Sequence, residues 1–136
     1  MQMITVKCTI HRPIEKVWEL WITPEHIMNW NQANDDWHTP SAINDLKVGG
    51  EFVYHMAAKD GSMAFDFRGF YTEVEPCELI VYQLEDGREV TVSMREIEGG
   101  TEVVETFDRD DNSIELQQQG WHAILNSFKT YAERMI

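Results

Sequence analysis

The chain is poor in basic residues. Its 11 lysines and arginines are outnumbered by 24 aspartates and glutamates, which gives a formal net charge of −13. A surface of that sign repels phosphate backbones and anionic lipid headgroups alike. The charge therefore argues against nucleic acid as a partner and is typical of an acidic, well-solvated surface.

Cysteines and long apolar runs are also scarce. Cys8 and Cys77 are the only two cysteines, which is too few for a disulfide framework, and we expect free thiols in a reducing compartment. Residues 1–10 lack a basic-then-apolar leader, and no apolar run approaches the roughly 18 residues that a membrane span requires. These absences predict a cytoplasmic protein without a membrane span.

Several catalytic motifs are missing. The sequence has no Gly-x-Ser-x-Gly, no phosphate-binding glycine loop and no dinucleotide fingerprint, so it offers no support for a cofactor. Its five histidines show no close spacing such as His-x-x-x-His: His11, His26, His38, His55 and His122. We therefore expect no metal site.

Aromatic residues, by contrast, are plentiful at 11% of the 136 residues, and the length suits one domain spanning residues 1–136. Apolar residues alternate from Ile4 to Ile10, which predicts a strand with one buried face. Pro13 then opens a short amphipathic helix, and Pro24 opens a second that holds Ile27 and Trp30.

A strand meander follows the two helices. We expect residues 31–44 to be irregular, because they are polar and contain Pro40, and residues 45–50 to form a short strand with a tight turn. Short turns separate five further strand-like runs, which must therefore be antiparallel: residues 51–58, 63–75, 79–85, 88–98 and 101–109.

The final 24 residues, 113–136, predict one long helix with a single apolar stripe. The stripe comprises Trp121, Ile124, Leu125, Phe128, Tyr131, Ala132 and Met135. A lone helix that follows a meander must bury this stripe on the sheet, and a curved sheet that grips one helix tends to leave a cavity between them.

Short segments along the whole chain carry a family resemblance. They are Pro13-Ile14-Glu15-Lys16-Val17-Trp18, Pro24-Glu25-His26 with Trp30, Asp45-Leu46-Lys47-Val48-Gly49-Gly50-Glu51-Phe52, Gly69-Phe70-Tyr71-Thr72-Glu73-Val74-Glu75-Pro76 with Leu79-Ile80, Gly99-Gly100-Thr101, and Gly120-Trp121 with Leu125. In these the sequence resembles the heat-shock protein 90 ATPase activator-like proteins of the superfamily that includes START lipid-transfer domains, birch-pollen-type allergens and polyketide cyclases (SRPBCC). The resemblance implies an α+β helix-grip fold of order β-α-α-β(6)-α.

Strand parity and the helix stripe together predict the cavity wall. For most of these residues close packing in a filled core is the competing interpretation. The candidate lining residues are Trp30, Trp37, Phe52, Tyr54, Met56, Phe65, Phe67, Tyr71, Val81, Val92, Trp121, Leu125 and Phe128. Trp37, which falls in the irregular segment, is expected to plug the core rather than to cover a pocket as a lid.

Gln83 and Glu105 share strand parity with apolar neighbours and are candidate polar anchors. The alternative for each is a rim position with its polar tip in water, which suits Glu105 better than Tyr71. A β-bulge would invert such assignments.

The first functional hypothesis is a non-enzymatic protein that binds a hydrophobic or aromatic small molecule, lipid-like or polyketide-like. The resemblance offers a chaperone-ATPase regulator, with a chaperone as partner, as one alternative. A cyclase or dehydratase using Tyr71 or His122 is the other.

Overall fold

The computed structural model describes residues 3–135 and contains a single curved sheet with three helices. The elements in chain order are β1 (Met3–Ile10), α1 (Ile14–Ile22), α2 (Pro24–Trp30), β2 (Trp37–Asn44), β3 (Glu51–Ala58), β4 (Ala64–Glu75), β5 (Leu79–Leu84), β6 (Glu89–Ile97), β7 (Gly100–Asp108) and α3 (Ile114–Arg134). Met1 and Ile136, the outer ends of the domain expected at residues 1–136, lie outside the described residues. The structure confirms the predicted α+β helix-grip fold.

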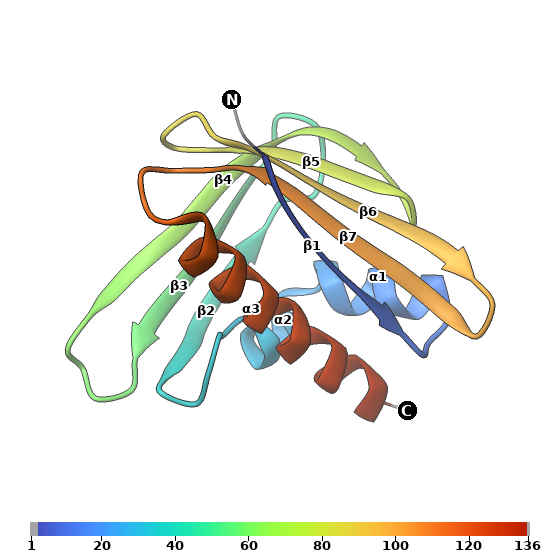
Figure 1. Ribbon diagram of the computed structural model, residues 1–136, viewed down its shortest axis with the longest axis horizontal. Helices are drawn as coiled ribbons and strands as arrows, with labels where there is room; N and C mark the ends of the chain where they lie inside the picture. The colour runs from blue at the N-terminus through green and yellow to red at the C-terminus, as the bar shows by residue number, and fades with distance from the viewer. Residues whose placement is uncertain (1–2, 136) are drawn as a thin grey trace.

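All seven strands pair antiparallel in the order β1-β7-β6-β5-β4-β3-β2. Figure 1 shows α3 running across one face of the curved sheet, with α1 and α2 on the same side. The two short helices contact α3 and close off the space beside its second half. The sheet and α3 therefore face each other, as the apolar stripe of the helix requires.

The last helix begins at its expected residue for a local reason. The Ser113 side chain accepts a hydrogen bond from the Leu116 amide at 3.1 Å, and Glu115 in the first turn suits the positive end of the helix dipole. Gln117 ties the preceding loop to this turn. Its amide donates to the Asn112 carbonyl at 2.7 Å, and its side-chain oxygen accepts from the Asp110 amide at 2.9 Å.

The expectation of an irregular segment from residue 31 to residue 44 holds for residues 31–36 and was wrong for residues 37–44. Residues 37–44 form β2, the edge strand beside β3, and the register shifts between His38 and Ser41, where Pro40 lies. Proline has no amide hydrogen to donate, so it is tolerated where a strand is at an edge and bulged. Sequence reasoning took Pro40 as evidence against a strand when it marked an edge strand.

The short strand expected at residues 45–50 is instead a turn that leads into β3. The Asp45 amide donates to the Glu51 carbonyl at 3.1 Å, and the Gly50 amide donates to the Lys47 carbonyl at 2.8 Å. A Cβ atom on Gly50 would lie 2.0 Å from the Asp45 carbonyl oxygen, so only glycine fits this turn. The six strands expected between the helical pair and α3 are present, but the first of them is β2.

Pairing with β4 and β6 decides which residues of β5 face α3. Tyr82 pairs with the buried Tyr71 and Val90, and Ile80 pairs with the buried Val92, whereas the bulge at Thr72 changes only the parity of β4 beyond Tyr71. Ile80, Tyr82 and Leu84 are the buried residues of β5. The assignment of Val81 and Gln83 to the inner face was therefore wrong, because β5 is apolar on both faces and its own sequence does not show which one is buried.

The core is filled beside the two short helices. Trp21 and Trp30 lie with their ring centroids 4.8 Å apart, and Phe128 of α3 meets both of them edge-on, at 4.8 and 4.9 Å. The Trp30 indole N–H donates to the Leu20 carbonyl at 3.0 Å, so its polar atom has a partner. This half of the interface between sheet and helices is close-packed, which leaves the other half to be considered as a site.

Candidate functional site

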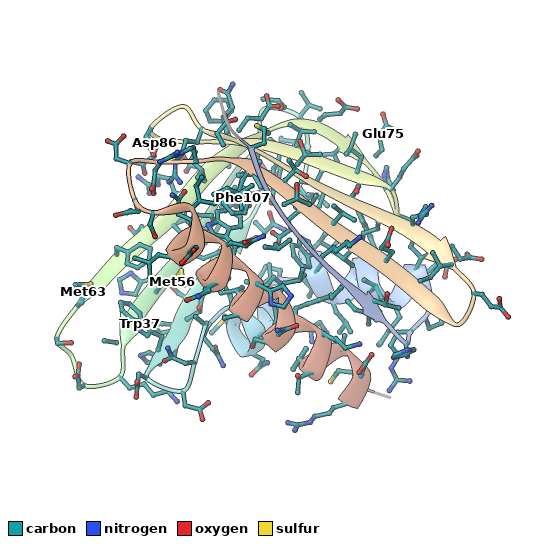
Figure 2. The ribbon with its side chains drawn as sticks, viewed as in Figure 1. Trp37, Met56, Met63, Glu75, Asp86 and Phe107 are labelled. Carbon is teal, nitrogen blue, oxygen red and sulfur yellow. The ribbon has the colours of Figure 1, made fainter. Side chains whose placement is uncertain are left out.

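A cavity of about 500 Å³ lies between the sheet and the first half of α3. Its lining comprises Trp21, Trp30, Asn31, Phe52, Tyr54, Met56, Phe65, Phe67, Tyr71, Ile80, Tyr82, Arg88, Glu105, Asp110, Asn112, Leu116, Gln117, Gly120, Trp121 and Ile124. Figure 2 shows Met56 at the end of the sheet near Trp37 and Met63, and Phe107 in the sheet close to the start of α3. The lining is mostly apolar and aromatic, with a few polar groups.

Phe52 is the centre of the aromatic wall on the sheet. Its ring lies 4.9 Å from Tyr54, 5.5 Å from Tyr71 and 4.8 Å from Tyr82, the last of these edge-on. The ring lies over Gly69 of β4, where a Cβ atom would come within 2.8 Å of it. The absence of a side chain at Gly69 thus lets Phe52 lie flat on the sheet and leaves space above the ring.

Helix α3 forms the opposite wall. Trp121 stacks on Phe107 of β7 with ring centroids 4.1 Å apart and an interplanar angle of 16°, and it meets Phe67 edge-on at 6.0 Å. Gly120, one residue earlier, lines the cavity, and a Cβ atom there would have no heavy-atom neighbour within 4 Å. A glycine in the interior of a helix costs about 1 kcal/mol relative to alanine. Close packing does not account for this glycine, because there is room for a side chain.

The cavity has an apolar rim. Phe65 of β4 is 47% exposed and Leu116 of α3 is 67% exposed, although both line the cavity. Arg88, from the β5–β6 turn, forms an ion pair with Asp110 in the loop before α3, with the nitrogen 3.4 Å from the oxygen. The rim therefore joins apolar side chains at the surface to one charged pair that ties the turn to the loop.

Three tyrosines supply the hydroxyl groups of the wall. Tyr71 donates a short hydrogen bond to the Asn44 side-chain oxygen of β2. Burial raises the pKa of Tyr54, of Tyr71 and of Tyr82 above the ordinary value for tyrosine. All three phenols stay neutral at physiological pH and serve as hydrogen-bonding groups rather than as charges.

Glu105 is the buried carboxyl group of the cavity. It lies on β7 and is only 5% exposed, which excludes the alternative of a rim position with its tip in water. Burial raises its pKa from 4.5 to about 8. A carboxyl group that is neutral at pH 7 donates a hydrogen bond, and within a closed aromatic site it can also supply or accept a proton.

The structure brings many of the sequence-predicted residues to the cavity and leaves others elsewhere. Those that line it are Trp30, Phe52, Tyr54, Met56, Phe65, Phe67, Tyr71, Glu105 and Trp121. Val92, Leu125 and Phe128 are buried in the filled core and do not line it. Val81 and Gln83 belong to the outer parity of β5.

Trp37 neither plugs the core nor lines the cavity. It begins β2, is partly buried, and meets the exposed Phe65 edge-on at 5.9 Å. Figure 2 shows it beside Met63 at the outer end of the sheet. Its indole ring therefore covers apolar surface outside the rim.

Sequence reasoning missed several lining residues. Tyr82 and Ile80 were missed because β5 has apolar residues at both parities, whereas Ile124 was already on the helix stripe and could have been included. Arg88 and Asp110 come from turns and carry no periodic signal. The same holds for Asn31 and Asn112, which reach the cavity only because the loops fold back onto it.

Within residues 3–135, no group of three or more histidine, cysteine, aspartate or glutamate residues is placed to hold a metal ion. His55 points away from the cavity, as expected, and its Nδ1 lies 2.7 Å from Asp66 on the exposed face. His122 is exposed and lies 3.1 Å from the Asn126 amide of the same helix. Among the described helices, none combines the length and the apolar character that a membrane crossing needs.

A curved antiparallel sheet that grips one long helix over an apolar cavity defines the class as a helix-grip domain of the SRPBCC superfamily. The family model described as activator of Hsp90 ATPase homolog 1-like protein matches residues 11–133. The chain belongs to this family.

Solved structures agree with this membership. The solution structure of the AHSA1-like protein from Aeromonas hydrophila is 46% identical, with a TM-score of 0.92 over 97% of this chain and 92% of that one. A protein from Cytophaga hutchinsonii is 53% identical, with a TM-score of 0.84 over 96% of this chain and 91% of that one. No curated protein matches the sequence.

The fold extends to more distant sequences. A protein from Chromobacterium violaceum shares 19% identity with this chain, yet it superposes with a TM-score of 0.86 over 99% of this chain and all of the other. At that identity the likeness concerns the fold alone.

Proposed function

We propose that this protein binds a hydrophobic or aromatic small molecule, lipid-like or polyketide-like, in the cavity between the sheet and the first half of α3. The observation that carries this proposal is the space of about 500 Å³ with an aromatic wall. Pockets for small molecules typically measure about 300–1,000 Å³ and combine apolar walls with a few polar groups. Folds of this family commonly bind hydrophobic ligands.

The interior of the protein is uneven in a way that favours this function. Protein cores are normally close-packed, and the half beside α1 and α2 follows this rule. The other half keeps an open volume walled by Phe52, Tyr82 and Trp121. Gly120 preserves part of that volume at a cost in helix stability of about 1 kcal/mol.

The exposed rim offers a way in. Phe65 and Leu116 are apolar, exposed and part of the lining, so a hydrophobic molecule would meet apolar surface from the rim inward. The charge of −13 disfavours anionic ligands and polyanionic partners, which leaves uncharged molecules as the better match.

A substitution that fills the cavity gives the direct test. In Gly120→Phe a ring would project from α3 into the open volume, and a helix tolerates phenylalanine better than glycine. We expect naphthalene derivatives and a medium-chain fatty alcohol to shift the amide resonances of Phe52, Tyr82 and Trp121 in the wild-type protein. The same titration of Gly120→Phe should leave those resonances in place.

The matched control is Gln119→Phe, which adds the same ring at an exposed position one residue earlier. It should bind as the wild-type protein does. Equal binding by Gly120→Phe and the wild type, or shifts confined to surface residues, would contradict binding in this cavity.

Regulation of a chaperone ATPase is a second candidate, because the family model that matches residues 11–133 is described by that activity. It is tested by adding the protein to a purified chaperone of the Hsp90 type and measuring ATP hydrolysis. Stimulation by the wild type and by Gly120→Phe alike would favour this role, since a filled cavity leaves the outer surface unchanged. No stimulation together with no co-precipitation would remove it.

A further inference from the structure

We propose that Glu105 is the polar anchor of the cavity and that the bound molecule is an uncharged aromatic or aliphatic compound with a hydrogen-bond acceptor, such as a ketone or ester carbonyl, at its buried end. This inference rests on the proposed function and names the chemical class of its ligand.

Strand pairing fixes the position of Glu105. On β7 it lies between Val6 of β1 and Val92 of β6, its partners in the two neighbouring strands. Its parity is that of Val103 and Phe107, which are both fully buried toward α3. The sheet thus holds a carboxyl group in a row of apolar side chains, and the pairing on both sides prevents the strand from turning it outward.

Within residues 3–135, no side chain or backbone group hydrogen-bonds to the Glu105 carboxyl, and no cation forms an ion pair with it. Every fully enclosed polar side-chain atom in the same residues does have a partner. The Glu105 oxygens must therefore be reached from the cavity that the residue lines. A buried polar group costs free energy unless it is hydrogen-bonded. A ligand that hydrogen-bonds to the Glu105 carboxyl group would therefore remove this cost.

The groups around Glu105 do not neutralise a negative charge on it. On β1, Cys8 is uncharged, because burial raises its pKa to about 12. The Lys129 ammonium of α3 donates to the Thr9 carbonyl and lies 3.0 Å from a Glu133 carboxylate oxygen, so it is engaged elsewhere.

The cavity walls provide no free cation either. The titratable groups that β3, β4 and β5 contribute to the cavity lining are Tyr54, Tyr71 and Tyr82, whose pKa values are all raised by burial. Helix α3 contributes uncharged lining residues, and at the mouth Arg88 is ion-paired with Asp86 and Asp110.

The carboxyl group is consequently protonated at neutral pH, with burial as the cause of its raised pKa of about 8. A protonated carboxyl donates one strong hydrogen bond, which a carbonyl oxygen accepts. A pure hydrocarbon would leave the donor unpaired, and an ammonium group would first require the proton to leave Glu105. An uncharged acceptor at the end of an apolar body therefore fits the site best.

Three probes of similar size separate these classes: acetylnaphthalene, ethylnaphthalene and naphthylethylamine. They carry a carbonyl acceptor, no polar group and an ammonium group, respectively. For the wild-type protein we expect acetylnaphthalene to bind about three- to tenfold more tightly than ethylnaphthalene at about pH 7. Between about pH 7 and pH 9 the protonated fraction of Glu105 falls about tenfold, so this preference should shrink toward equal binding of the two probes.

Two substitutions provide the controls. Glu105→Gln keeps a donor of similar shape and cannot ionise, so it should bind acetylnaphthalene within about threefold of the wild type at about pH 7 and lose the pH dependence. Glu105→Leu removes the donor, and it should bind both naphthalenes equally. A carbonyl preference that survives in Glu105→Leu would overturn the role of Glu105.

If the wild-type protein binds naphthylethylamine more tightly than the other two probes, and Glu105→Gln loses that binding, the choice of an uncharged ligand is overturned in favour of a cation. Equal binding of acetylnaphthalene and ethylnaphthalene by the wild type, with shifts at the cavity residues, would overturn the anchor while leaving the proposed function intact. Binding of neither probe in the cavity would refute the proposed function itself.

Discussion

The Glu105→Gln substitution also tests the burial of this carboxyl group in the absence of any ligand. The folded protein holds Glu105 with a pKa of about 8, whereas the ordinary value is 4.5. Between those values the folded state retains a proton that the unfolded chain releases. The contribution of Glu105 to stability is therefore fully present below about pH 4.5 and is lost as the pH rises through about 8.

The size of the effect follows from the pKa difference. Each pH unit in this window lowers the free energy of unfolding by about 1.4 kcal/mol, so the loss between about pH 5 and pH 8 amounts to about 3–4 kcal/mol. Above about pH 8 the loss levels off, because both states are then ionised. Glutamine has the same shape and does not titrate, so the variant should lack this slope.

The measurement is urea unfolding of the wild type and Glu105→Gln across this pH range, with the difference in free energy plotted against pH. The histidines and surface carboxyl groups are common to both proteins, so their titration cancels in the difference. Glu73→Gln removes an exposed carboxylate from β4 and serves as the control for a loss of charge.

If the free energies of unfolding of the wild type and Glu105→Gln run parallel from about pH 5 to pH 8, the reasoning is refuted. Glu105 would then be solvated or paired in the folded protein. A wild type that gains stability relative to Glu105→Gln as the pH rises would contradict the sign. Equal slopes for Glu105→Gln and Glu73→Gln would show that net charge, rather than burial, sets the effect.

Three further outcomes are expected. Gly120→Ala should raise the free energy of unfolding by about 1 kcal/mol, because the added Cβ atom meets open space in a helix. Thermal unfolding should show this as a rise of a few degrees in the midpoint, and a lower midpoint would contradict the open volume. Phe128→Ala should cost about 3–5 kcal/mol and alter the tryptophan fluorescence, since the ring is fully buried against Trp21 and Trp30. Contacts with His11 and Lys129 lower the pKa of Glu133 to about 2, so Glu133→Gln should lose stability present above about pH 4.5, and the loss should vanish as the pH falls through about 2. Exposure to solvent keeps that loss below about 1 kcal/mol in urea unfolding.

The course of β2 and β5 shows where prediction from the sequence ended. The bulge at Thr72 and the edge position of β2 are properties of strand pairing, and pairing is a contact between segments distant in the chain. Because apolar residues occur at both parities of residues 79–84, nothing local to β5 showed that Tyr82, and not Val81 or Gln83, lies beside Tyr71 and faces α3.

Glu105 shows the same limit for the site. Its alternation with Val103 and Phe107 already indicated that it belongs to the inner face of the sheet. The sequence did not reveal that the space above it stays open and that no cation among residues 3–135 pairs with it. Those facts depend on where α3 lies over the sheet and on what Lys129 and Arg88 contact.

The sequence by itself determined the order of the elements, the antiparallel meander and the apolar stripe of α3. These are set by local periodicity and turn residues, which a single chain segment carries within itself. Only the tertiary structure decided that one half of the space under α3 is filled by Trp21, Trp30 and Phe128 while the other half stays open around Glu105. Packing density and desolvation are properties of the assembled neighbours, so no single segment could reveal them.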